Sequence, residues 1–273
     1  MGAEIELGFS DLLANGQAVG RVGGAVVFCF GPLPEERARV RITTVKPKYA
    51  VGELIELTLR SSLRAQPFCP VFGICGGCQL QHLAYPAQLS WKRDVVRNAL
   101  QRIGGFGDAR VNDTIGMVFP RAYRNKMSLV VDHVFTSARI GFYQQRSHEL
   151  VPIDGCPIVI PQLNSYIAKL NDSRVDPEIA PVFSDTCHIV ARGARATEQS
   201  VVTFTTPRAS SEVTKAAPAL LARLPGAVGI TNSFELSSQN AIMGRKHRVV
   251  AGAGQIEERI GGVRYRVSAG SFF

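Results

Sequence analysis

Residues 69–82 read CPVFGICGGCQLQH, and this stretch organises the chain around it. Its three cysteines, Cys69, Cys75 and Cys78, have the spacing C-x5-C-x2-C, and two adjacent glycines let the backbone turn tightly enough for neighbouring thiolates to converge. A fourth candidate, Cys156, follows after 77 intervening residues. Four thiolates suit tetrahedral zinc as well as a 4Fe-4S cluster, and unligated buried thiols are a third alternative.

Two features favour an iron–sulfur cluster over zinc. Cys69 and Cys156 each precede a proline, as does the last cysteine of many ferredoxin-type runs. The loop is also apolar around its cysteines, and a dry shell protects such clusters from solvent. We therefore predict a metal centre whose ligands are Cys69, Cys75, Cys78 and Cys156.

Length and charge narrow the class of protein. A chain of 273 residues suggests about two domains. Its 31 Lys and Arg against 22 Asp and Glu give a net charge of +9, which favours a polyanionic partner such as nucleic acid or, equally, a solvated basic surface. No signal peptide and no apolar stretch of ~20 residues is evident, so we expect a cytoplasmic, monomeric protein without a membrane span. In a reducing compartment six cysteines favour metal binding over disulfides, and we expect Cys29 and Cys187 to be buried.

The first sixty residues have the pattern of a small β-barrel. Short β-like runs alternate with turn residues such as Gly23-Gly24, which indicates about five strands and no helix. Alternation places Arg37, Arg39 and Arg41 on one strand face, where they contact either phosphates or solvent. NGQAVGRVGGAVVFCFGPLPEERARVRI resembles the TRAM domain, an OB-like RNA-binding barrel, so this resemblance implies RNA contacts at Arg39 and Arg41. Glu35 departs from that family, which usually has glycine after the proline.

The rest of the chain predicts a helix and an α+β domain. Residues 86–103 have an amphipathic helical pattern, and residues 121–273 alternate strands with helices expected at 161–170 and 211–224. We expect four segments: a barrel at 1–60, the cysteine loop at 61–82, a helical segment at 83–120 and an α+β domain at 121–273. Basic residues interleaved with aromatics near the strand ends suit single-stranded RNA. The candidates for RNA contact are Arg124, Asn125, Lys126 and Arg146.

The cysteine stretch resembles the iron–sulfur motif of the RNA uracil-5-methyltransferase family, whose members make 5-methyluridine in 23S ribosomal RNA. YRNKMSL, GFYQQRSHELVPIDGCP and the last forty residues follow that family too. The resemblance implies that Cys69, Cys75, Cys78 and Cys156 bind a 4Fe-4S cluster, that 23S ribosomal RNA is the partner and that Phe272 helps to hold the target uracil. It also implies S-adenosylmethionine as the methyl donor of the full-length enzyme.

In the family the catalytic cysteine, the base and the donor site lie in a Rossmann-like domain that would follow residue 273. The sequence therefore predicts a fold class of OB-like barrel plus α+β domain with the Rossmann-like methyltransferase domain absent, and no catalytic residue in this chain. In that arrangement residues 83–120 would pack on the missing domain. The expected function is the RNA-binding and iron–sulfur portion of a 23S ribosomal RNA uracil-5-methyltransferase, inactive alone. The alternatives are a stand-alone RNA-binding module, a fragment of a tRNA uracil-5-methyltransferase and a cluster-sensing protein.

Overall fold

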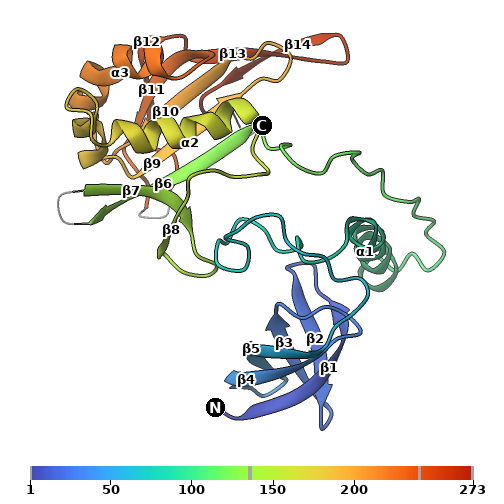
Figure 1. Ribbon diagram of the computed structural model, residues 1–273. Helices are drawn as coiled ribbons and strands as arrows, with labels where there is room; N and C mark the ends of the chain where they lie inside the picture. Colours follow the sequence, from blue (N-terminus) through green and yellow to red (C-terminus); the bar gives the residue numbers. More distant parts are fainter. Residues whose placement is uncertain (1, 135–136, 239–240, 272–273) are drawn as a thin grey trace. The chain divides into compact units, whose positions relative to one another are not determined.

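The computed structural model describes residues 2–134, 137–238 and 241–271, which form two compact units (Figure 1). The first unit comprises Met1–Gly73 with Cys78–Phe119, and the second comprises Ile74–Gly77 with Pro120–Phe273. Four residues of the cysteine loop thus belong to the second unit while the rest of the loop belongs to the first. No helix within the described ranges is long and apolar enough to cross a membrane.

Five strands of the first unit close into a barrel in the order β1-β2-β3-β5-β4 (blue in Figure 1), which confirms the predicted barrel. Their alternating pattern buries one face of each strand: in β4, Ala38, Val40 and Ile42 point into the core while the arginines between them face solvent. Gly23 and Gly24 both have positive φ and connect β2 to β3, as a tight hairpin requires. The strands are β1 (Glu4–Leu12), β2 (Gln17–Val22), β3 (Ala25–Phe30), β4 (Arg37–Lys46) and β5 (Tyr49–Leu59).

A buried ion pair fixes the segment that leaves the barrel. The Glu36 carboxylate is fully buried, and Arg64 donates to both of its oxygens, from Nε at 2.6 Å and from its terminal nitrogen at 2.7 Å. Backbone N–H groups of Leu33 and Ser61 donate to the same carboxylate. Burial alone would raise the pKa of Glu36, but these hydrogen bonds and the Arg64 charge outweigh it and lower the pKa below 4.5.

Helix α1 (Tyr85–Asn98) follows, with Pro86 in its first turn, and a π-helical turn (Ala99–Ile103) extends it to the end of the predicted helix. One side of α1 packs on the barrel, where Ala87 and Trp91 contact the buried core and the Trp91 indole Nε1 donates to the carbonyl of Leu12 at 2.9 Å. Ala87 and Trp91 thus attach α1 to its own unit, whereas Val96 and Ile103 are 50% and 88% exposed.

The second unit is built on a seven-stranded sheet of order β12-β11-β10-β9-β6-β7-β8. All neighbouring strands in it are antiparallel except β10 and β11, which are parallel, so the predicted α+β character of this part matches the observed topology. The strands are β6 (Lys126–Val134), β7 (Ser137–Tyr143), β8 (Leu150–Pro152), β9 (His188–Gly193), β10 (Ser200–Thr205), β11 (Ala227–Phe234) and β12 (Lys246–Gly252).

Two helices cover one face of this sheet. Helix α2 (Pro161–Ser173) buries Leu163, Tyr166 and Ile167, and helix α3 (Ser211–Arg223) buries Val213 and Leu220 (Figure 1). The opposite face is covered in part by a hairpin, β13 (Gln255–Ile260) and β14 (Val263–Ser268), whose Ile256 packs with Val201. The remainder of that face carries the pocket described below.

Some elements differ from the sequence prediction. The sequence did not predict strand β12 or the short 3-10 helix at Ala180–Ser184. The residues of β12, KHRVVAG, are mostly exposed in the structure and lack the apolar alternation that marks a strand. Cys29 is buried as predicted, and burial raises the pKa of its thiol to about 12. Cys187 is only half-buried, in contrast to the prediction.

Candidate nucleic-acid interface and cysteine loop

Segment Ile74–Gly77 of the cysteine loop pairs with the loop that connects β7 to β8. Gly76 N–H donates to the Tyr143 carbonyl at 2.9 Å, and Gln145 N–H donates to the Ile74 carbonyl at 3.2 Å. The backbones of Cys75 and Gln144 thereby form an isolated antiparallel β-bridge. A Cβ on Gly76 would lie 3.2 Å from the Gln145 Cα, so glycine permits this close approach. Gly76, the first of the two adjacent glycines, thus permits close packing of the backbone.

The other candidate ligands lie in similarly ordered turns. Cys69 N–H donates to the Gln81 side-chain oxygen at 3.1 Å, so a residue of the same loop fixes the backbone at Cys69. Cys156 N–H donates to Asn164 Oδ1 at 2.7 Å at the start of α2. The N–H of Gly77 donates to the Cys75 sulfur at 3.4 Å.

The four candidate cysteines are divided between the two compact units. All four are half-buried thiols, with Cys69 and Cys78 in the first unit and Cys75 and Cys156 in the second. Within the described ranges no group of three or more His, Cys, Asp or Glu side chains is arranged to hold a metal ion. The four-thiolate centre therefore stays a prediction that rests on the chemistry of the donor set.

His82 is a feature of the motif whose environment the sequence did not reveal. It is 3% exposed and stacks at a tilt on Phe72 with ring centroids 5.2 Å apart, and neither ring nitrogen has a hydrogen-bond partner among the described residues. Burial, together with the positive charge of Arg64, lowers the pKa of His82 to about 4, against the opposing effect of Glu36. His82 is therefore neutral at pH 7.

The arginines of the barrel surface are paired with carboxylates. Arg39 contacts Glu56 at 3.0 Å and Arg41 contacts Glu4 at 3.1 Å, with all four side chains about half exposed. These cross-strand pairs reduce the positive charge of the face that was expected to contact phosphates. The solvated alternative describes this face well, and RNA contact at Arg39 and Arg41 remains a prediction.

The predicted cations of the second unit lie at two places on it. Arg124 and Asn125 are exposed just before β6, where the backbone of Arg124 pairs with that of Ile158 and Ile160 beside the Cys156 turn. Lys126 begins β6 opposite Arg192 of β9. Burial and the charge of Arg192 lower the pKa of Lys126.

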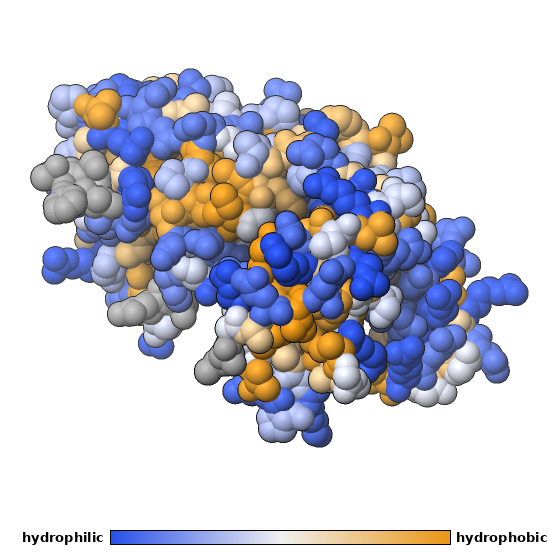
Figure 2. Space-filling model, turned by 60° about the horizontal axis from the view of Figure 1, so that its bottom comes forward, coloured by the Kyte–Doolittle hydropathy of each residue, from blue (hydrophilic) through white to orange (hydrophobic). Residues whose placement is uncertain are grey.

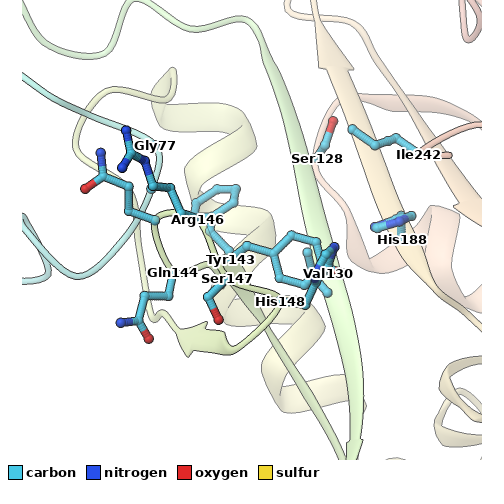
Figure 3. Close-up of a pocket in the computed structure, with 13 residues that line it drawn as sticks. Gly77, Ser128, Val130, Tyr143, Gln144, Arg146, Ser147, His148, His188 and Ile242 are labelled. Carbon is cyan, nitrogen blue, oxygen red and sulfur yellow. The ribbon is translucent and has the colours of Figure 1, made fainter. Parts of the chain in front are cut away.

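Arg146 lies in the loop between β7 and β8, exposed and with φ of 59°. This loop borders a pocket of about 470 Å³ on the face of the sheet that the helices leave uncovered (Figure 3). Ser128 and Val130 of β6 and His188 of β9 form its floor, with Tyr143 and His148 beside them. The remaining lining residues are Gly76, Gly77, Phe142, Gln144, Gln145, Arg146, Ser147 and Ile242. Phe272, the residue expected to hold the target base, lies outside the described residues.

Comparison with known proteins identifies the barrel and relates the chain to a class of enzymes. Residues 1–55 match the family model of the TRAM domain. A Bacillus cereus protein described as an RNA methyltransferase is 32% identical over 98% of this chain and 60% of its own length. A Nostoc protein of the same description is 34% identical over 100% of this chain and 61% of its own length. The chain thus spans about 60% of the curated relatives it matches.

The fold also matches a solved enzyme. The crystal structure of a Pyrococcus abyssi tRNA (uracil-54, C5)-methyltransferase with S-adenosyl-L-homocysteine aligns with 98% of this chain and 60% of its own, with a TM-score of 0.69 and 24% identity. This match shows a likeness of fold.

These comparisons correct two expectations. The sequence predicted a fold class defined by an absent Rossmann-like methyltransferase domain, and a function limited to an inactive RNA-binding and iron–sulfur portion. Both relied on the position of the last residue, and both are overturned because RNA methyltransferases align with 98% or more of this chain and a methyltransferase crystal structure matches 98% of it. The expectation that the protein lacks the catalytic cysteine, the base and the donor site is likewise unsupported. The chain carries a TRAM domain at residues 1–55 and is similar over nearly its whole length to RNA methyltransferases.

Proposed function

We propose that this protein is a cytoplasmic, S-adenosylmethionine-dependent RNA methyltransferase that transfers a methyl group to C5 of a uracil, with 23S ribosomal RNA as its substrate class. The observation that carries the proposal is the similarity of 32–34% identity to RNA methyltransferases along 98–100% of the chain. The TRAM barrel, a type of domain that binds RNA, and the net positive charge of the chain support the proposal. The fold shared with an enzyme crystallised with S-adenosyl-L-homocysteine supports the choice of methyl donor.

Within this function the second unit supplies contacts to RNA. Arg124 and Asn125 are exposed at one end of β6, and Arg146 is exposed in the loop that borders the pocket. Guanidinium groups suit phosphates because they present several N–H donors in a fixed plane. The ion-paired arginines of β4 contribute less, since their carboxylate partners repel phosphate.

Four cysteines of this protein would hold a 4Fe-4S cluster: Cys69, Cys75, Cys78 and Cys156. Support comes from the donor set of half-buried thiols and from the Gly77 N–H, which donates to the Cys75 sulfur as backbone amides do toward cluster thiolates. When bound, such a cluster would supply a structural centre. Protein purified without oxygen is expected to contain iron and sulfide and to absorb near 400 nm; one zinc in a colourless protein would contradict the cluster.

The function is tested by methyl transfer. The protein expressed from its complete coding sequence is incubated with methyl-labelled S-adenosylmethionine and either 23S ribosomal RNA or tRNA, both taken from cells that lack the enzyme. Mass spectrometry of the nucleosides is expected to show labelled 5-methyluridine in the ribosomal RNA. Label in tRNA alone would refute the ribosomal substrate, and absence of label from both would refute the activity.

A further inference from the structure

The pocket of the second unit combines flat walls with polar edges. Tyr143 and His148 meet edge to face, with ring centroids 5.2 Å apart and an interplanar angle of 78°, beside the strand that carries Val130 (Figure 3). Such pairs present flat, polarisable surfaces to a third ring. The volume of about 470 Å³ lies within the range of about 300–1,000 Å³ that small ligands occupy.

Polar side chains around the pocket offer hydrogen-bond donors and acceptors to a ligand. Ser128, Gln144 and Gln145 line the pocket, and no described residue hydrogen-bonds to the side chain of any of them. A hydroxyl and two amides offer both donors and acceptors. His188 is 5% exposed, and burial lowers the pKa of its imidazole although a hydrogen bond to the Leu129 backbone opposes this shift, so the ring is neutral at pH 7.

The charge of the pocket suits one strand of a polyanion. Arg146 lies in its wall, and none of the described residues that line it is Asp or Glu. A nucleotide needs this combination, since its base has flat faces with polar edges and its phosphate is anionic. A base inside a duplex cannot reach such a site because its faces are stacked and its edges are paired.

From this arrangement we infer that the pocket bounded by the β7–β8 loop and by Gly76-Gly77 binds an unpaired RNA base, with Tyr143 as the stacking platform and Arg146 on the adjoining phosphate. The inference rests on the proposed RNA substrate. The wall contains Gly76, which hydrogen-bonds to the Tyr143 carbonyl. The cysteine loop therefore takes part in building the base pocket.

The first test maps the site in the unaltered protein. A short single-stranded oligouridine carrying 5-iodouridine is bound, irradiated and digested, and the cross-linked peptide is sequenced. We expect cross-links to Tyr143 or His148. Cross-links only to residues outside the pocket would overturn the inference.

The second test measures affinity with Tyr143→Leu and with Ser128→Leu, which fills the pocket from its floor. Because Tyr143→Leu removes the stacking ring and Ser128→Leu obstructs the pocket, each variant should bind oligouridine about tenfold or more weakly while binding duplex RNA of equal phosphate number as before. Tyr265→Leu is the matched control, since Tyr265 is a 46% exposed tyrosine of β14 in the same unit. Oligouridine binding that is equal for the wild type and both pocket variants would overturn the pocket while leaving the proposed function intact, and failure of the wild type to bind any RNA would overturn both.

Discussion

The Arg64 guanidinium holds the buried carboxylate of Glu36 through two hydrogen bonds, and one of its terminal nitrogens also donates to the carbonyl of Gly31 at 2.6 Å. Arg64 lies 28 residues beyond Glu36 and only five before Cys69. Arg64 thus anchors the segment that leads into the cysteine loop to the barrel, because the buried Glu36 carboxylate requires a positively charged partner.

We expect Arg64→Met to destabilise the protein strongly. Removing one partner of a buried ion pair leaves the other charge without compensation, which lowers the free energy of unfolding by about 3–5 kcal/mol. Arg41→Met is the control, because Arg41 and Glu4 are about half exposed and such pairs contribute about 0–1 kcal/mol. Urea unfolding followed by circular dichroism measures both; equal losses in the two variants would contradict the assigned importance of the buried pair.

The free energy of unfolding is expected to decrease as the pH is lowered, because His82 is buried in its neutral form. Its folded pKa of about 4 lies below the unfolded value of 6.5, so the unfolded chain takes up a proton first as the pH falls. The contribution of His82 is complete above pH 6.5 and is lost at up to about 1.4 kcal/mol per pH unit as the pH falls toward 4. Urea titrations across this range should show the slope in the wild type and a flatter one in His82→Phe. His247→Phe, which replaces an exposed histidine, should keep the slope, and a variant His82→Phe with the wild-type slope would disprove this role.

Replacing Glu35 by glycine is expected to stabilise the barrel. Glu35 has φ of 68°, and this left-handed conformation costs a residue with a side chain about 1–2 kcal/mol. Glycine avoids that cost and gives back about 0.5–1 kcal/mol through the greater freedom of the unfolded chain, so a net gain of about 0.5–1 kcal/mol follows. Thermal unfolding should show a higher midpoint for Glu35→Gly, and Glu35→Gln should show none because it keeps the side chain. A lower midpoint for the glycine variant would mean that the weak contact from Ser61 matters more.

The adjacent glycines Gly76 and Gly77 of the cysteine motif should differ in how far they tolerate replacement by alanine. A Cβ at position 76 would press on Gln145 Cα and the Tyr143 carbonyl at 3.2 Å, whereas a Cβ at position 77 would meet only the Cys75 sulfur at 3.5 Å. Gly76→Ala should therefore loosen the pairing with the β7–β8 loop, and hydrogen exchange at the Gln145 amide should become about tenfold faster, which corresponds to about 1.4 kcal/mol of local opening. Gly77→Ala should leave that rate unchanged. Similar rates in the two variants would show that close approach is not the reason for Gly76.

The sequence by itself determined the local structure of this protein. Alternation placed Ala38, Val40 and Ile42 inside a barrel, and Gly23-Gly24 marked its hairpin. These features depend on neighbours in the chain, since side-chain period and backbone sterics are local properties.

Only the tertiary structure decided which distant groups meet. It paired Glu36 with Arg64 and neutralised Arg39 and Arg41 of β4 with carboxylates from other strands. It also left both nitrogens of His82 without partners among the described residues and joined Gly76 to Tyr143 at the end of β7. Each of these depends on contacts between residues far apart in sequence, and desolvation in the folded chain sets their strength. Such contacts follow from the sequence only through the complete fold, so they could not be inferred from local patterns of residues.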